Sequence, residues 1–101
     1  MTRELRNAVS RLRKLQDAAF AGKIECPSLI VNISSHNTRY YDGNRCSVEV
    51  SVNTFNELNE SEKHLYFSMS DKRCYEIGGD DTEWSIEDIL HEISLAVNYQ
   101  V

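Results

Sequence analysis

Residues 29–52, LIVNISSHNTRYYDGNRCSVEVSV, decide the fold, because two alternating apolar runs enclose a turn. In the first run, apolar residues stand at every other position, with Ile30 as an exception: Leu29, Val31 and Ile33. The second run alternates serines and a glutamate with Cys46, Val48, Val50 and Val52. A period of two is typical of strands that bury one face. The stretch therefore predicts a β-hairpin.

The register of this hairpin follows from its turn. Asp42-Gly43 is a favoured two-residue turn, and a turn there makes the numbers of paired residues sum to 85. The sum must be odd, because odd-numbered apolar residues of one strand have to share a face with even-numbered ones of the other. This register pairs Ile33 with Val52, His36 with Glu49 and Tyr40 with Arg45. It makes residues 34–41 an extension of the first strand.

Two amphipathic helices are expected at the ends of the chain. Residues 2–21 can begin at the capping residue Thr2 and end at Gly22, with an apolar stripe of Leu5, Ala8, Val9, Leu12, Leu15, Ala19 and Phe20. The last helix can begin at Ser85 as N-cap, with Trp84 packing onto Ile89. Its buried stripe would be Ile86, Ile89, Leu90, Ile93, Ala96 and Val97.

Two further strands are expected between the first hairpin and the last helix. Residues 53–63 are a polar connection with room for one helical turn, and Leu65, Phe67 and Met69 then alternate. A three-residue turn, Asp71–Arg73, would return Tyr75 and Ile77 to the same face, and Gly78-Gly79 would end that strand.

The predicted fold is α+β, in the order α-β-β-β-β-α. The simplest packing is a four-stranded antiparallel sheet with two helices packed on one face. The other face would be solvated and lined by Ser47, Glu49, Ser51, His64, Tyr66, Ser68 and Glu76. The chain has 101 residues, one proline and no repeats, so we expect residues 1–101 to form a single α+β domain.

Composition favours a soluble cytoplasmic protein. No apolar run reaches the roughly 20 residues that a membrane helix needs, and no secretory signal is recognised at the N-terminus. The three cysteines are spread out and include no C-x-x-C, so a disulfide framework is not expected.

Charge is distributed unevenly along the chain. Residues 1–23 carry six basic and two acidic side chains, a balance of +4, and the overall charge of −5 therefore leaves −9 for the remainder. Residues 76–92 hold seven carboxylates and no lysine or arginine. Opposite charges in two parts of a chain indicate internal pairing or charged partners.

The sequence favours a non-catalytic protein-binding domain. Tyrosine and arginine are enriched at interface hot spots, which makes Arg39, Tyr40, Tyr41 and Arg45 at the hairpin tip a predicted contact surface. A second predicted surface is the acidic segment and the outward stripe of the last helix: Asp80, Asp81, Glu83, Glu87, His91, Leu95 and Tyr99. The stripe would serve a protein partner or a homodimer. A dense carboxylate surface also suits an inhibitor or regulator of a larger nucleic-acid-handling complex, since it can occupy a phosphate-binding site.

Nucleic-acid binding is the alternative function. The predicted contacts are the basic residues on the polar face of the first helix, Arg3, Arg6, Arg11, Arg13 and Lys14. The low isoelectric point of about 5.1 argues against it.

Catalysis, metals and cofactors are not expected. Asp80-Asp81-x-Glu83 lacks the ligand spacing of a calcium loop, and no nucleophile or phosphate-binding motif is present. A small enzyme built around His36 and Glu49 remains a third hypothesis, which requires a concave site around His36.

Overall fold

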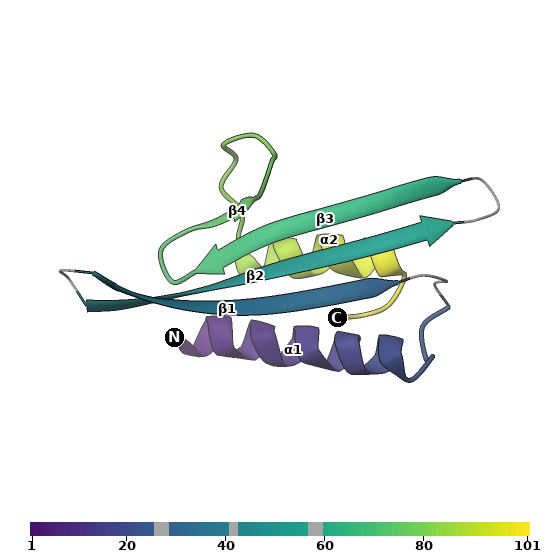
Figure 1. Cartoon of the computed structure of the whole chain (residues 1–101), viewed down its shortest axis with the longest axis horizontal. Coiled ribbons are helices and arrows are strands. Elements are labelled where there is room, and N and C mark those ends of the chain that lie inside the picture. Colours follow the sequence, from purple (N-terminus) through teal and green to yellow (C-terminus); the bar gives the residue numbers. More distant parts are fainter. Residues whose placement is uncertain (26–28, 41–42, 57–59) are drawn as a thin grey trace.

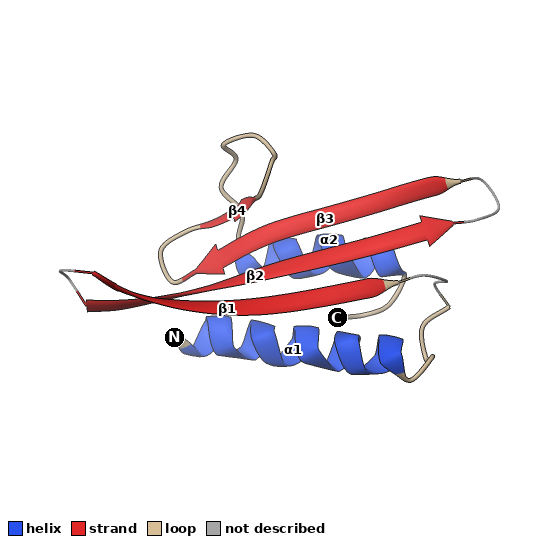
Figure 2. Cartoon of the chain, viewed as in Figure 1, coloured by secondary structure: helices blue, strands red, loops and turns tan. Residues whose placement is uncertain are grey.

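The structure is a computed structural model that describes residues 1–25, 29–40, 43–56 and 60–101. For residues 38–40, 43–45 and 56 it describes the backbone alone. The elements are α1 (Arg3–Phe20), β1 (Ile30–Tyr40), β2 (Gly43–Asn56), β3 (Ser61–Ser70), β4 (Cys74–Glu76) and α2 (Ile86–Val97) (Figure 2). The predicted order α-β-β-β-β-α is confirmed.

The four strands form one antiparallel sheet in the order β1-β2-β3-β4, and both helices cover the same face of it (Figure 1). α1 packs against β1, and α2 packs against β2 and β3. The two helices also contact each other. The opposite face of the sheet is open. Neither helix in the described ranges has the length and apolarity to cross a membrane.

A row of valines on the central strand β2 carries the core. Val48, Val50 and Val52 have exposed fractions of 0–1%. On β3, Met69 pairs with Val48 and Phe67 pairs with Val50, so large side chains extend the row. The helices cover it with buried residues from both stripes, Leu5, Leu12, Leu15, Ile89, Leu90 and Ile93.

The predicted register of the first hairpin is wrong by two residues. Val31 pairs with Val52, His36 with Ser47 and Tyr40 with Gly43. Paired numbers therefore sum to 83, and Gly43 is the first residue of β2. The sum is still odd, so the apolar residues keep the face that alternation predicts. The prediction that residues 34–40 extend the first strand is confirmed, while Tyr41 and Asp42 lie outside the described residues.

The second hairpin is longer than the polar sequence of residues 53–63 indicates. β2 continues to Asn56, which pairs with Ser61 at the start of β3. The expected helical turn is wrong for the residues described here. Cross-strand pairs such as Asn53–His64 and Thr54–Lys63 keep polar side chains in strands, because both strands extend beyond the core into solvent.

The β3–β4 turn closes over two residues, Asp71 and Lys72, instead of the predicted three, and this shifts the pairing by one residue. The backbone N–H of Ser70 donates to the carbonyl of Arg73 at 3.0 Å, and Met69 pairs with Cys74. A one-residue shift exchanges the two faces of a strand. Buried Cys74 therefore takes the inner position, and Tyr75 lies on the outer side opposite Ser68. The prediction that Tyr75 joins the core face is wrong, and Glu76 aligns with Phe67 rather than with the outer row.

Both helices begin where their capping residues predict. The Thr2 hydroxyl accepts the N–H of Leu5 at 3.2 Å, and the Ser85 hydroxyl accepts the N–H of Asp88 at 3.1 Å. Trp84 packs edge-on against Phe67 with ring centroids 5.1 Å apart. The predicted stripes are wrong at Phe20, which is 96% exposed where α1 ends, and Ala18 is buried in its place. Ala19 and Ala96 are only half-buried.

Replacement of Phe67 by alanine is expected to lower the free energy of unfolding by about 3–5 kcal/mol, because the ring is buried on the sheet against Trp84. Phe55→Ala is the matched control, since Phe55 is 37% exposed at the far end of β2. Urea denaturation followed by circular dichroism measures both variants. Equal losses in the two variants would contradict this core assignment.

Candidate protein-binding surfaces

The β1–β2 hairpin continues past the rest of the sheet as a two-stranded arm. β3 ends at Ser70, which pairs with Ser47. The β1–β2 pairs from Asn37–Cys46 to Tyr40–Gly43 therefore have no third strand beside them. The arm extends beyond both helices at the left of Figure 1.

The predicted tip residues belong to this arm. Arg39 and Tyr40 are in β1 and Arg45 is in β2. Tyr41, and the side chains of all four residues, lie outside the described part of the structure. The tip as a contact surface stays a prediction.

The outward side of α2 exposes the stripe that helical spacing predicts. His91 is exposed, Leu95 is 62% exposed and Tyr99 is 39% exposed. The helix ends at Asn98, which adopts the left-handed conformation with φ of 52°, and the Tyr99 N–H donates to the carbonyl of Ser94 at 3.2 Å. These bonds place Tyr99 just past the last turn of α2, beyond Leu95.

The acidic residues before α2 lie in an exposed loop that leaves the sheet after β4 (Figure 1). Asp80 is engaged locally: hydrogen bonds from the Thr82 hydroxyl and from its backbone N–H, the latter at 3.0 Å, lower the pKa of Asp80. Asp81 and Glu83 are exposed. Because this loop precedes α2 and Tyr99 follows it, the acidic loop residues lie at the opposite end of the helix from Leu95 and Tyr99.

The basic residues of α1 divide into two groups. Arg11 faces α2, where it forms a 3.0 Å salt bridge with Glu87 and donates to the backbone carbonyl of Val101 at 2.6 Å. It lies at a groove of about 400 Å³ between the two helices. Arg11 was predicted to contact nucleic acid and Glu87 to contact a partner. In the structure the two side chains pair with each other. The remaining four residues are exposed: Arg3, Arg6, Arg13 and Lys14.

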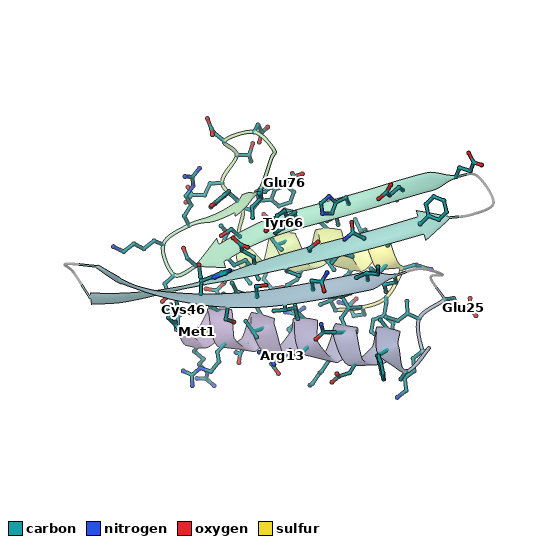
Figure 3. The ribbon with its side chains drawn as sticks, in the orientation of Figure 1. Met1, Arg13, Glu25, Cys46, Tyr66 and Glu76 are labelled. Carbon is teal, nitrogen blue, oxygen red and sulfur yellow. The ribbon has the colours of Figure 1, made fainter. Side chains whose placement is uncertain are left out.

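The open face of the sheet holds a polar cluster that joins β1, β2 and β3. The Tyr66 hydroxyl donates to Oε2 of Glu49 at 2.9 Å, and Nε2 of His36 lies 3.6 Å from the same oxygen. His36 reaches Glu49 diagonally, since it pairs directly with Ser47. The rings of His64 and Tyr66 stack with centroids 6.0 Å apart. Tyr66 is labelled on this face in Figure 3.

The cluster continues along β2. The Ser51 hydroxyl lies 3.4 Å from Nε2 of His64 and accepts a hydrogen bond from Nδ2 of Asn53 at 3.2 Å. Sequence reasoning placed Ser51, His64 and Tyr66 on this face but missed their connection to Glu49. The missing signal was the β2–β3 register, which aligns Glu49 with Ser68 and Ser51 with Tyr66.

The cluster satisfies its own polar groups on an open surface. The His36 side chain is 54% exposed, and the groove between the helices contains none of these residues. Within the described ranges, no group of three or more His, Cys, Asp or Glu side chains is placed to hold a metal ion. The arrangement orders the outer surface of three strands.

No protein-family model, curated protein or solved structure matches the chain.

Glu49 should control the titration of Tyr66. The hydrogen bond to the Glu49 carboxylate raises the pKa of Tyr66 above the ordinary value of a tyrosine, because it favours the protonated phenol. The hydrogen bond therefore stabilises the folded state fully below the pKa of tyrosine in the unfolded chain. This stabilisation is lost as the pH rises through the higher pKa of Tyr66 in the folded state.

Replacement of Glu49 by glutamine is expected to lower the Tyr66 pKa, measured as the ring ¹³Cζ shift against pH. Glu62→Gln is the control, because Glu62 is exposed on the same strand as Tyr66 and four residues away. An unchanged Tyr66 titration in the Glu49 variant would contradict the hydrogen bond.

Proposed function

We propose that this chain is a non-catalytic protein-binding domain that uses the outward side of α2. The observation that supports the proposal is the exposure of Leu95 on a helix whose other side fills the core, together with that of Tyr99 just past the end of this helix. Both side chains offer apolar contact area at the C-terminal end of α2, and tyrosine adds a polar group suited to an interface.

The charge around these residues indicates the kind of partner. Asp88, His91 and Glu92 lie seven, four and three residues before Leu95, so all three are on the same side of α2 as Leu95. The carboxylates of Asp88 and Glu92 therefore border the apolar side chains of Leu95 and Tyr99. We define the α2 surface as Asp88, His91, Glu92, Leu95 and Tyr99. A complementary partner has an apolar pocket bordered by basic side chains.

An acidic inhibitor or regulator of a nucleic-acid-handling complex is one form of this function. Sites that bind nucleic-acid phosphates carry lysine and arginine. The α2 surface, with Asp81 and Glu83 beyond its N-terminal end, would present carboxylates to such a site. The projecting arm supports a second contact through its tip, where Arg39, Tyr40, Tyr41 and Arg45 remain the proposed residues. Assignment to the cytoplasm remains a prediction from composition.

Nucleic-acid binding by α1 remains the alternative. The exposed positions of Arg3, Arg6, Arg13 and Lys14 support it, whereas the pairing of Arg11 with Glu87 removes one predicted contact. A second copy of the chain is the alternative partner for the α2 surface.

Double replacement of Leu95 and Tyr99 by alanine is expected to abolish capture of the specific partner and leave the fold unchanged, because both side chains are exposed. The measurement is quantitative affinity capture with the full chain, with the thermal unfolding midpoint recorded for each variant. Phe55→Ala is the matched control, since it removes a partly exposed aromatic ring from the sheet and should retain the partner.

Retention of the same partner by the Leu95→Ala/Tyr99→Ala variant would contradict use of the α2 surface. A wild-type chain that elutes as a dimer, and a double variant that elutes as a monomer, would identify a second copy as the partner.

A further inference from the structure

The open edge of β1 is the largest unpaired stretch of backbone in the described sheet. β1 is a terminal strand of 11 residues, Ile30–Tyr40, and only β2 pairs with it. Edge strands commonly carry charges, proline or bulges that prevent pairing with another chain. Arg39 is the one charged residue of β1, and residues 30–38, IVNISSHNT, contain no proline, lysine, arginine or carboxylate. The exposed start of β3 differs, since it carries Glu62 and Lys63.

A side chain of α1 already bonds to this edge. Nε2 of Gln16 donates to the backbone carbonyl of Val31 at 2.9 Å. Because backbone groups of an edge strand point alternately toward and away from its neighbour, we expect Ile33, Ser35 and Asn37 to present their N–H and C=O groups outward as well. These groups can accept an added strand.

The orientation of α1 places two arginines beside the edge. Arg11 and Arg13 lie about 100° to either side of buried Leu12 on the helix. Arg11 reaches toward α2, so Arg13 is on the opposite flank, where Gln16 meets β1. Arg6 and Phe20 lie seven residues from Arg13 in either direction and share that flank. Arg13 is labelled on α1 just below β1 in Figure 3.

This flank offers charge and apolar area to an incoming strand. Arg6 and Arg13 are exposed, and neither forms a salt bridge within the described residues. At the end of α1, Phe20 is 96% exposed, and Ile30 at the start of β1 is 55% exposed. A strand paired with β1 would direct every second side chain toward the α1 flank.

Charge disfavours a symmetric partner at this edge. In an antiparallel pairing of two β1 strands about a two-fold axis, the α1 flanks of the two copies would face each other. Arg6 and Arg13 would then meet the same arginines of the second copy, which is unfavourable. A partner that carries carboxylates at alternate positions has the complementary charge.

We propose that the β1 edge, with Arg6 and Arg13 of α1, binds an extended acidic peptide segment by strand addition. The backbone of the segment pairs with β1, and its alternate carboxylates contact the two arginines. This surface is separate from the α2 surface, and the proposal does not depend on that one.

The test uses the full chain and fluorescein-labelled peptides of about ten residues, a length that matches β1. The first peptide alternates glutamate with threonine, the second alternates lysine with threonine, and the third alternates glutamate with proline, which cannot pair as a strand. Fluorescence anisotropy measures each Kd at physiological salt. We expect saturable binding of the first peptide alone.

Charge-reversal variants locate the site. Arg6→Glu/Arg13→Glu is expected to raise the Kd of the glutamate–threonine peptide by about tenfold or more. Arg3→Glu/Lys14→Glu changes the net charge equally but alters residues that face away from β1, and it should change the Kd by less than about twofold. The Leu95→Ala/Tyr99→Ala variant should bind as the wild type does. Bound peptide should shift the amide resonances of Ile33, Ser35 and Asn37.

The proposal would be overturned if the glutamate–threonine peptide did not bind, or if the glutamate–proline peptide bound with an equal Kd. It would also be overturned if both charge-reversal variants raised the Kd equally, or if bound peptide shifted no amide resonance of β1. A labelled single-stranded oligonucleotide that binds more tightly than the peptide, and that both charge-reversal variants weaken equally, would assign these arginines to nucleic acid instead.

Discussion

The valine row of β2 is the constraint on which the rest of the structure depends. Val48, Val50 and Val52 are fully buried on one face of a strand that has neighbours on both sides. Burial of one face fixes which residues of β1 and β3 point inward, and it leaves the other face to Glu49 and Ser51. Both helices cover the same face because only that face is apolar, and the open face carries the polar cluster for the same reason.

The alternating pattern predicts faces better than it predicts register. A shift of two residues in the first hairpin keeps every apolar side chain on the same face, so hydrophobicity does not distinguish a sum of 85 from one of 83. The turn preference of Asp42-Gly43 suggested the first sum, and pairing of Tyr40 with Gly43 gives the second. At β4, a strand of three residues, the pattern is too short to fix even the face, and Tyr75 was assigned wrongly.

The candidate surfaces were predictable to the extent that they are local. Helical spacing alone predicts that His91 and Leu95 point outward, and they do. Contacts between distant segments were not predictable from one sequence. The hydrogen bond of Gln16 to Val31 and that of Arg11 to the carbonyl of Val101 depend on how α1 lies against β1 and α2. The first of these contacts orients α1 at the sheet edge, and the second removes Arg11 from the basic surface.

The arrangement separates surfaces of opposite character within a small domain. α2 and the loop before it present carboxylates, while the β1 flank of α1 presents arginines next to unpaired backbone. The salt bridge between Arg11 and Glu87 joins the two helices on the side that lies between these surfaces. The two proposed surfaces therefore do not overlap.

The β1–β2 register is the most direct test of this account, because the residues paired in the arm and the position of His36 relative to Glu49 follow from it. Nuclear Overhauser contacts between Hα protons identify opposed residues in antiparallel strands at non-hydrogen-bonded pairs. The structure predicts such contacts between Val31 and Val52 and between Ile33 and Val50. Contacts between Ile33 and Val52 would contradict it, and would restore the register that ends in a turn at Asp42-Gly43.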